Sequence, residues 1–287
     1  MLNGNRRCSH MIYKYELCIC IPTFNRADEV FNLVNGILKS KNEKLTIVVL
    51  DNASPDNTLN QLERINDSRL NVFSNEQNKG SLYNFINVLN KVDNAKYALF
   101  CLDKDKLNIE HIDRFISNLE GSNAVGGYVS HGDGLDTECN YNLWHEFNSG
   151  YSAIKNIAYL GRHPSGYFFN VQKLSEINFV ERYSDKNIVG LFPFEFILAD
   201  LLVRDKGAIY FGQLIKTESL ENARKTKSFT INGNLSTAYF HPRARAKQAA
   251  NFCLHVSKLK LSKLDKLRLG FNNFKNGLLV STVGYRA

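Results

Sequence analysis

The stretch "YALFCLDKDKLN", residues 97–108, passes directly from an apolar run into two carboxylates one residue apart. The run up to Leu102 is typical of a buried strand, and Asp103 and Asp105 are each followed by a lysine. Aspartate is common in the turns that end strands, so an Asp-x-Asp pair by itself is most often solvated loop. Whether this pair forms a site depends on what the rest of the fold places beside it.

Apolar runs and helical patterns alternate along the first half of the chain. Apolar residues at helical spacing predict helices over 25–40, 78–92 and 108–119, with a short helix through Leu62. Between and after them we predict strands over 16–22, 44–50, 69–75, 97–102, 124–130 and 165–171. Strands that are apolar throughout and alternate with helices are typical of a parallel sheet covered on both faces. The fold class is therefore α/β, with a mostly parallel sheet.

The regular alternation ends near residue 130. Residues 131–150 are polar and loop-like, followed by a short helix at 151–159 and a helix from Pro193 that Gly207 should stop. A basic helical tail begins at about 240. We expect a domain over 1–240, with a first half at about 16–130 and a second at about 131–240, and a helical extension over 241–287.

Composition is ordinary for a soluble globular protein, at 44% hydrophobic and 22% charged residues. The first residues carry charge but no apolar run, so we expect no signal peptide and a cytoplasmic location. The six cysteines are scattered and form no Cys-x-x-Cys pair, which argues against a zinc site. We expect those in the apolar runs to act as small hydrophobic side chains.

The positive charge is concentrated in the tail. Residues 241–287 hold ten Lys or Arg and one acid, a balance of +9, which leaves 26 basic and 27 acidic residues in 1–240. This distribution disfavours a body that binds nucleic acid and favours a basic C-terminal patch that faces an anionic partner.

Each of the first four predicted strands ends in polar residues: "PTFNR" (22–26), "DNASPDNT" (51–58), "NEQNKGS" (75–81) and "DKDK" (103–106). Ligands of open parallel sheets collect beyond the carboxyl ends of the strands, so these loops predict one polar crevice. The Gly-x-Gly-x-x-Gly and P-loop signatures are absent, which disfavours a dinucleotide dehydrogenase or a P-loop phosphotransferase. A diphosphate held by a divalent cation on Asp103 and Asp105 fits what remains.

Four segments in order, "ICIPTFNR", "IVVLDNASPDNT", "NKGSLYNFINVL" and "LFCLDKDKLN", resemble the family 2 glycosyltransferases of the GT-A fold. The resemblance is strongest to the branch that builds bacterial surface polysaccharide such as O-antigen, capsule or lipooligosaccharide. It covers 16–120 well and 160–210 loosely. It implies an inverting transfer of a sugar from a nucleotide-diphosphate donor, usually UDP-linked, to a glycan or lipid-linked acceptor.

The resemblance also implies roles for particular residues. Asp51 would read the base edge, usually uracil, and Asp103 and Asp105 would bind Mn²⁺ or Mg²⁺, with His241 as a third ligand. Lys104 and Lys106 depart from the small or acidic residues usual in the family, so they either face solvent or supply charge to the diphosphate, and metal dependence stays open. The full nucleotide-sugar set would be Pro22, Thr23, Asn25, Arg26, Asp51, Asn52, Ser54, Asn78, Lys79, Gly80, Asp103 and Lys104.

For the catalytic base, the resemblance points to Glu195, twelve residues before Gly207, although Phe196 stands where the family usually has an aspartate. Asp200 is the alternative. The segment "GRHPSGYFF" resembles the turn below the acceptor, which implies that Arg162, His163 and Ser165 line that side.

Several alternatives stay open at this stage. A sugar-1-phosphate nucleotidyltransferase has a similar sheet, but "CIPTFNR" lacks the glycine-rich loop with which such enzymes begin. A non-catalytic, transferase-like binding module is the second rival. The leucine- and lysine-rich tail could attach to the inner face of an anionic membrane, pack on its own domain or contact a second copy in a homo-oligomer.

Overall fold

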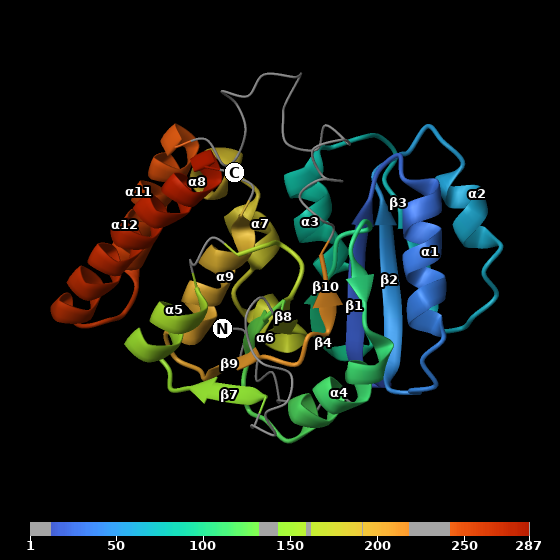
Figure 1. The fold of residues 1–287 in the computed structure, drawn as a ribbon, viewed down its shortest axis with the longest axis horizontal. Helices are drawn as coiled ribbons and strands as arrows, with labels where there is room; N and C mark the ends of the chain where they lie inside the picture. Colours follow the sequence, from blue (N-terminus) through green and yellow to red (C-terminus); the bar gives the residue numbers. More distant parts are fainter. Residues whose placement is uncertain (1–12, 132–142, 159–161, 191, 218–241, 287) are drawn as a thin grey trace, which may run out of the picture.

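The computed structural model describes residues 13–131, 143–158, 162–190, 192–217 and 242–286, and its centre is an eight-stranded sheet (Figure 1). The strand order is β3-β2-β1-β4-β8-β6-β9-β7, and a separate pair is formed by β5 and β10. The strands are β1 (Tyr15–Thr23), β2 (Leu45–Asp51), β3 (Leu70–Ser74), β4 (Ala95–Phe100), β5 (Lys106–Leu107), β6 (Gly126–Val129), β7 (Trp144–Phe147), β8 (Tyr167–Asn170), β9 (Gly207–Tyr210) and β10 (Ile215–Lys216).

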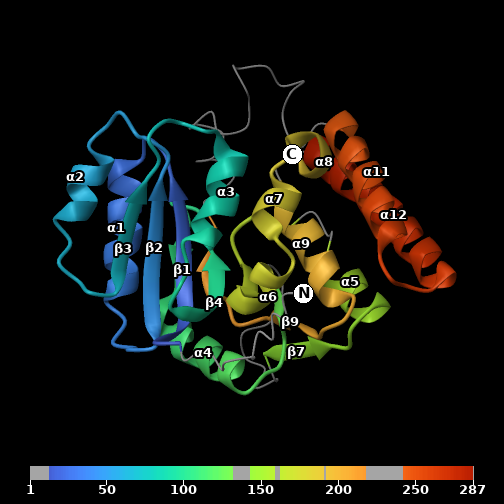
Figure 2. The ribbon, with the colours of Figure 1, turned by 180° about the vertical axis from the view of Figure 1, so that it is seen from behind.

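The helices of the first half are α1 (Ala27–Leu38), α2 (Thr58–Glu63), α3 (Ser81–Asn90), the 3₁₀ turn η1 (Ile109–His111) and α4 (Ile112–Glu120). Those that follow are α5 (Tyr151–Ile157), α6 (Val171–Glu176), α7 (Phe179–Tyr183), α8 (Lys186–Val189), α9 (Pro193–Leu202), α11 (Pro242–Lys258) and α12 (Lys263–Arg286). Figure 2 shows that α11 and α12 lie at the opposite end of the molecule from α2, as they do in Figure 1.

The sheet is mostly parallel, as predicted. Strands β3, β2, β1 and β4 run parallel, and so do β6 and β9. Strand β8 is antiparallel to both of its neighbours, and β7 is antiparallel to β9 at the edge. The four parallel strands therefore bring their carboxyl ends to one edge, where the polar loops begin.

Helices cover both faces of the sheet, because the apolar strands alternate between two buried clusters. Leu17, Ile19 and Ile21 of β1 share a cluster with the apolar faces of α1 and α4. Cys18 and Cys20 belong to a second cluster, with the apolar faces of α3 and α9. This two-sided burial is what the uninterrupted apolar runs predict.

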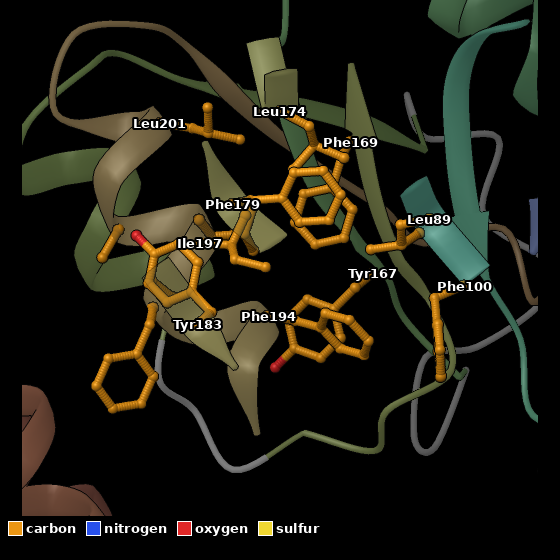
Figure 3. Close-up of a cluster of buried hydrophobic side chains, with 14 of the residues drawn as sticks. Leu89, Phe100, Tyr167, Phe169, Leu174, Phe179, Tyr183, Phe194, Ile197 and Leu201 are labelled. Carbon is orange, nitrogen blue, oxygen red and sulfur yellow. The ribbon is translucent and has the colours of Figure 1, made fainter. Parts of the chain in front are cut away.

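Aromatic rings join the second half to the sheet (Figure 3). The rings of Phe100 on β4 and Phe194 on α9 have centroids 4.5 Å apart, and Tyr167 on β8 lies 5.4 Å from Phe194. Helix α9 is buried along almost its whole length. Residues of the second half thus close one face of the sheet that the first half forms.

Several predictions for the second half were wrong, including the end of the helix predicted over 151–159, which the structure places at Ile157. The helix from Pro193 ends at Leu202, and Gly207 instead opens β9, where a Cβ would lie 2.5 Å from side-chain atoms of Ile157 and Leu202. The stretch expected to be loop over 131–150 contains β7, an edge strand of four residues. The strand predicted to reach 171 ends at Asn170, whose side chain accepts a hydrogen bond from the backbone N–H of Lys173 and starts α6.

The basic tail consists of two helices, α11 and α12, which pack against each other. Among the helices in the described part of the chain, none is both long and apolar enough to cross a membrane.

Candidate functional site

Hydrogen bonds join the loops that follow β1, β2 and β4 at the carboxyl edge of the sheet. The hydroxyl of Thr23 donates to Oδ2 of Asp103 at 2.9 Å, and the backbone N–H of Asn52 donates to the carbonyl of Thr23 at 3.0 Å. The guanidinium of Arg26 lies 3.8 Å from Oδ1 of Asp103. Residues from three predicted strand ends thus meet in one place.

Asp51 organises the loop after β2. Its Oδ2 accepts hydrogen bonds from the backbone N–H of Ser54 at 3.0 Å and from the hydroxyl of Ser74 at 3.2 Å, and its Oδ1 accepts one from the Ser54 hydroxyl. The same Ser54 oxygen accepts a bond from the backbone N–H of Asn25 at 2.7 Å, which ties this loop to the loop after β1. Asp51 is fully buried, so its first effect is to hold the shape of both loops.

A network of amide side chains connects the loop after β3 to this edge. The amide of Asn52 donates to Oδ1 of Asn78 at 3.0 Å and accepts from the backbone N–H of Lys79 at 3.1 Å. Gly80 has φ of +84°, a conformation that favours glycine, and its N–H donates to Asn78 at 2.9 Å just before α3 begins. The segment from Asn78 to Gly80 therefore lies against the loop after β2.

Sequence analysis missed Asn84, which is buried under this network. Its amide donates to the carbonyl of Leu50 at 3.0 Å and accepts from Asn75 at 3.2 Å. An amide within the apolar pattern of "LYNFINVL" was the available signal. Buried amides of this kind fix loop geometry because an unpaired one is costly.

The two acids that follow β4 are both buried. Burial raises the pKa of Asp103 to about 6, although the charge of Arg26 and the hydrogen bond from Thr23 act in the opposite direction. Asp105 accepts a hydrogen bond from the hydroxyl of Ser165, and that hydroxyl accepts the backbone N–H of Leu102 at 2.9 Å. The Asp-x-Asp segment is therefore built into the fold and is not a solvated turn.

A pocket of about 420 Å³ opens beside the pair, between α1 and the segment that leads to β5. Lys104 is half-buried and Lys106 is exposed. The sequence left open whether these lysines face solvent or supply charge to a diphosphate, and the structure gives the two different surroundings. The pocket is lined by Glu29, Asn32, Leu33, Gly36, Asp103, Lys104, Asp105, Lys106 and Leu107.

The two carboxylates fit a divalent cation of the magnesium type. Mg²⁺ and Mn²⁺ prefer oxygen ligands and are commonly held by one or two carboxylates together with substrate phosphates. The raised pKa of Asp103 means that its charged form gains from an added positive charge. Within the described ranges, no three His, Cys, Asp or Glu side chains gather as a complete metal cluster. The proposed third ligand, His241, lies outside the described residues.

His163 lies beside Asp105. Burial and the charge of Lys104 lower the pKa of His163 to about 4, so its ring is neutral near pH 7. Its Nδ1 accepts the backbone N–H of Ser165 at 3.3 Å, so the 3.5 Å approach of Nδ1 to Asp105 is no ion pair. His131, which sequence analysis missed, lies next to it, with Nε2 2.8 Å from the carbonyl of Ser165.

Glu195 is fully buried and connected to these residues through two tyrosines. Tyr167 donates to Oε1 of Glu195 at 3.4 Å, and its ring packs against Tyr128 with centroids 4.9 Å apart. The guanidinium of Arg162 lies 4.4 Å from the centre of the Tyr128 ring, and burial lowers the pKa of Arg162. Gln248 of α11 donates to Oε2 of Glu195 at 3.1 Å, so the tail also contacts this carboxylate.

Sequence analysis did not identify Tyr128, Tyr167 or Gln248. The two tyrosines read as ordinary strand residues, and Gln248 gave no signal at all. Asp200, the alternative base, lies in a different set of contacts: Arg182 at 2.8 Å, His255 at 3.2 Å and the hydroxyl of Tyr183. Glu195 is thus bonded by Tyr167 and Gln248, whereas Asp200 contacts Arg182, His255 and Tyr183.

The polar edge of this mostly parallel sheet is what a GT-A glycosyltransferase would have, and comparisons with known proteins identify the family. Residues 18–176, more than half of the chain, match the family described as Glycosyl transferase family 2. The chain therefore belongs to glycosyl transferase family 2 and is a glycosyltransferase. Membership favours the transferase over the two rivals from the sequence. Glu195 lies beyond the matched residues. No curated protein sequence matches this chain.

Solved structures share the fold at low sequence identity. S. aureus TarS 1–349 in complex with UDP-GlcNAc is 16% identical, with a TM-score of 0.67 over 91% of this chain and 72% of that one. The same protein in complex with UDP is 14% identical, with a TM-score of 0.63 over 88% and 69%. Mannosyltransferase PcManGT from Pyrobaculum calidifontis, in complex with GDP-Man and Mn²⁺, is 14% identical, with a TM-score of 0.57 over 94% and 74%.

Proposed function

We propose that this glycosyltransferase takes its sugar from a nucleotide-diphosphate donor, most simply a UDP-sugar, and transfers it with inversion to a glycan or lipid-linked acceptor. The observation that carries the proposal is the buried pair of Asp103 and Asp105 at the carboxyl edge of the parallel sheet. The donors in the TarS and PcManGT complexes, UDP-GlcNAc and GDP-Man, support a nucleotide-sugar donor.

Asp103 and Asp105 would hold a divalent cation, and when bound it supplies positive charge to the departing diphosphate. Arg26, in the loop after β1, approaches the carboxylate of Asp103, and Lys104 lies between the two acids in the sequence. Both would add positive charge for the diphosphate. The Mn²⁺ in the PcManGT complex supports this assignment.

The base and ribose would lie against the loops that Asp51 and Asn52 organise. Asp51 is fully buried, so it would shape the base site through the bonds that it accepts from Ser54 and Ser74. The segment from Asn78 to Gly80 borders the same space through its bonds to Asn52.

In the transfer step, the acceptor oxygen forms a bond to the anomeric carbon as the bond from that carbon to the diphosphate oxygen breaks. The acceptor proton must leave at the same time, and we assign Glu195 as the group that takes it. Its hydrogen bond from Tyr167, the contact of Tyr167 with Tyr128 and the Arg162 guanidinium over the Tyr128 ring support this assignment, because they link Glu195 to one of the predicted acceptor-side residues.

Calorimetry with UDP, GDP and CDP, each with and without Mn²⁺, tests the donor assignment, followed by a screen of nucleotide sugars for hydrolysis. Asp105→Asn should lose the Mn²⁺-dependent part of nucleotide binding. Asp93→Asn, which changes an exposed acid in the turn after α3, should keep it. If Asp105→Asn binds nucleotide and metal like the parent, the acid pair is not the diphosphate site.

A further inference from the structure

The C-terminal helix α12 presents an apolar stripe to the outside of the molecule. Leu264, Leu267, Phe271 and Phe274 are 55%, 72%, 72% and 61% exposed. Their spacing of three and four residues places them within about 80° of arc on a helix with 3.6 residues per turn. Four large exposed apolar side chains in one row form a continuous strip.

The other side of α12 is the one packed against the protein. Leu269 and Asn273 are each 4% exposed, and the amide of Asn273 donates to the carbonyl of Ala249 on α11 at 2.9 Å. Both fall roughly opposite the stripe on the helix. The stripe is therefore not a misplaced core face: α12 already has a packed side, and the hairpin of α11 and α12 lies at one end of the molecule (Figures 1 and 2).

Cations flank the stripe on both sides. Lys263 borders one edge, Arg268 and Lys275 border the other, and all three are exposed. Lys258 and Lys260, at the end of α11 and in the turn before α12, are exposed as well. The one acid between 241 and 287, Asp265, accepts a hydrogen bond from Ser262 at 2.7 Å. An apolar row between two rows of cations matches a surface of apolar chains under anionic head groups.

These charges disfavour a second copy of the chain as the occupant. If two stripes paired as a parallel coiled coil, Lys263 of one helix would face Arg268 of the other. In an antiparallel pair, Arg268 and Lys275 would face the same two cations of the partner. Like charges meet in both arrangements, so the cations that flank the stripe disfavour self-association.

We propose that α12 lies flat on an anionic phospholipid surface, with Leu264, Leu267, Phe271 and Phe274 inserted between the head groups and the flanking cations bound to phosphates. This inference does not rest on the donor site. That site lies at the carboxyl ends of β1, β2 and β4, whereas α12 packs against α11. It assigns to α12 a binding surface that includes none of the proposed catalytic or donor-binding residues.

The test is co-sedimentation of the full chain with vesicles of phosphatidylcholine mixed with phosphatidylglycerol, and with vesicles of phosphatidylcholine alone. We expect binding to the mixed vesicles, weakened by salt, and at least about ten-fold weaker binding to the neutral ones. Lys263→Ala and Lys275→Ala should each weaken binding about five-fold. The double variant L267E/F271E should lose it.

Phe73→Glu is the matched control, because Phe73 is an exposed aromatic residue on β3, far from the tail in the sheet order, and its change should leave vesicle binding intact. Equal binding to neutral vesicles, no binding of the parent chain, or full binding by L267E/F271E would each overturn the proposal. So would a dimer in sedimentation velocity that L267E/F271E abolishes, because the stripe would then belong to a second copy.

Discussion

Asp103→Asn should make the free protein more stable at pH 7 while it removes metal-dependent donor binding. The carboxyl group is buried, and its pKa rises from 3.8 to about 6 on folding. The ionised group therefore costs the folded state about 3 kcal/mol at pH 7, as an upper limit, at 1.36 kcal/mol for each tenfold change. Asparagine keeps the size and can still accept the hydrogen bond from Thr23.

The sign of the pH dependence follows from proton binding. Between pH 4 and pH 6 the folded state holds the Asp103 proton more tightly than the unfolded state, so this residue lowers stability as pH rises through that window. The advantage of the asparagine variant should be at most about 3 kcal/mol at pH 7 and about half as large at pH 5. With about 2.1 cal/mol/K of unfolding entropy per residue, 3 kcal/mol corresponds to roughly 5 °C for this chain.

Thermal unfolding followed by circular dichroism, with a chelator present and at several pH values from 5 to 7.5, measures this difference. Asp93→Asn is the control for a change of one exposed acid and should shift the melting temperature little. Mn²⁺ with a nucleoside diphosphate should then raise the melting temperature of the parent chain and leave that of Asp103→Asn unchanged. An asparagine variant that is less stable than the parent at pH 7, or a difference that does not shrink toward pH 5, would refute the argument.

Four further substitutions test the remaining assignments. Glu195→Gln should lower kcat by roughly 10²- to 10⁴-fold with donor affinity unchanged, whereas Asp200→Asn should keep turnover, and the reverse result would identify the wrong acid. Asp51→Ala should raise the donor KM and relax the choice among UDP-, GDP- and CDP-sugars, and an unchanged preference would contradict its role at the base. Gln248→Leu should lower kcat with donor affinity intact, since it leaves the Glu195 carboxylate without this donor, and equal kinetics would make the contact purely structural.

Local patterns in the chain were enough to predict the strands and helices of the first half, at about 16–130. Its strands are apolar runs, its helices repeat at 3.6 residues, and both signals need only neighbours in sequence. The polar ends of these strands had to meet because parallel strands end at one edge. That argument brought Thr23, Arg26 and Asp103 together before any contact was known.

Tertiary structure decided the rest, because the deciding contacts join residues far apart in the chain. Whether Asp103 and Asp105 were solvated or buried depended on Thr23, 80 residues earlier, and Ser165, 60 residues later. Short strands such as β7 and β9 form only because a neighbouring strand completes their hydrogen bonds, so four residues alone could not reveal them. Glu195 shows the same dependence, because its hydrogen-bond donors come from β8 and α11. No local pattern connects those two segments to the apolar helix that carries this carboxylate.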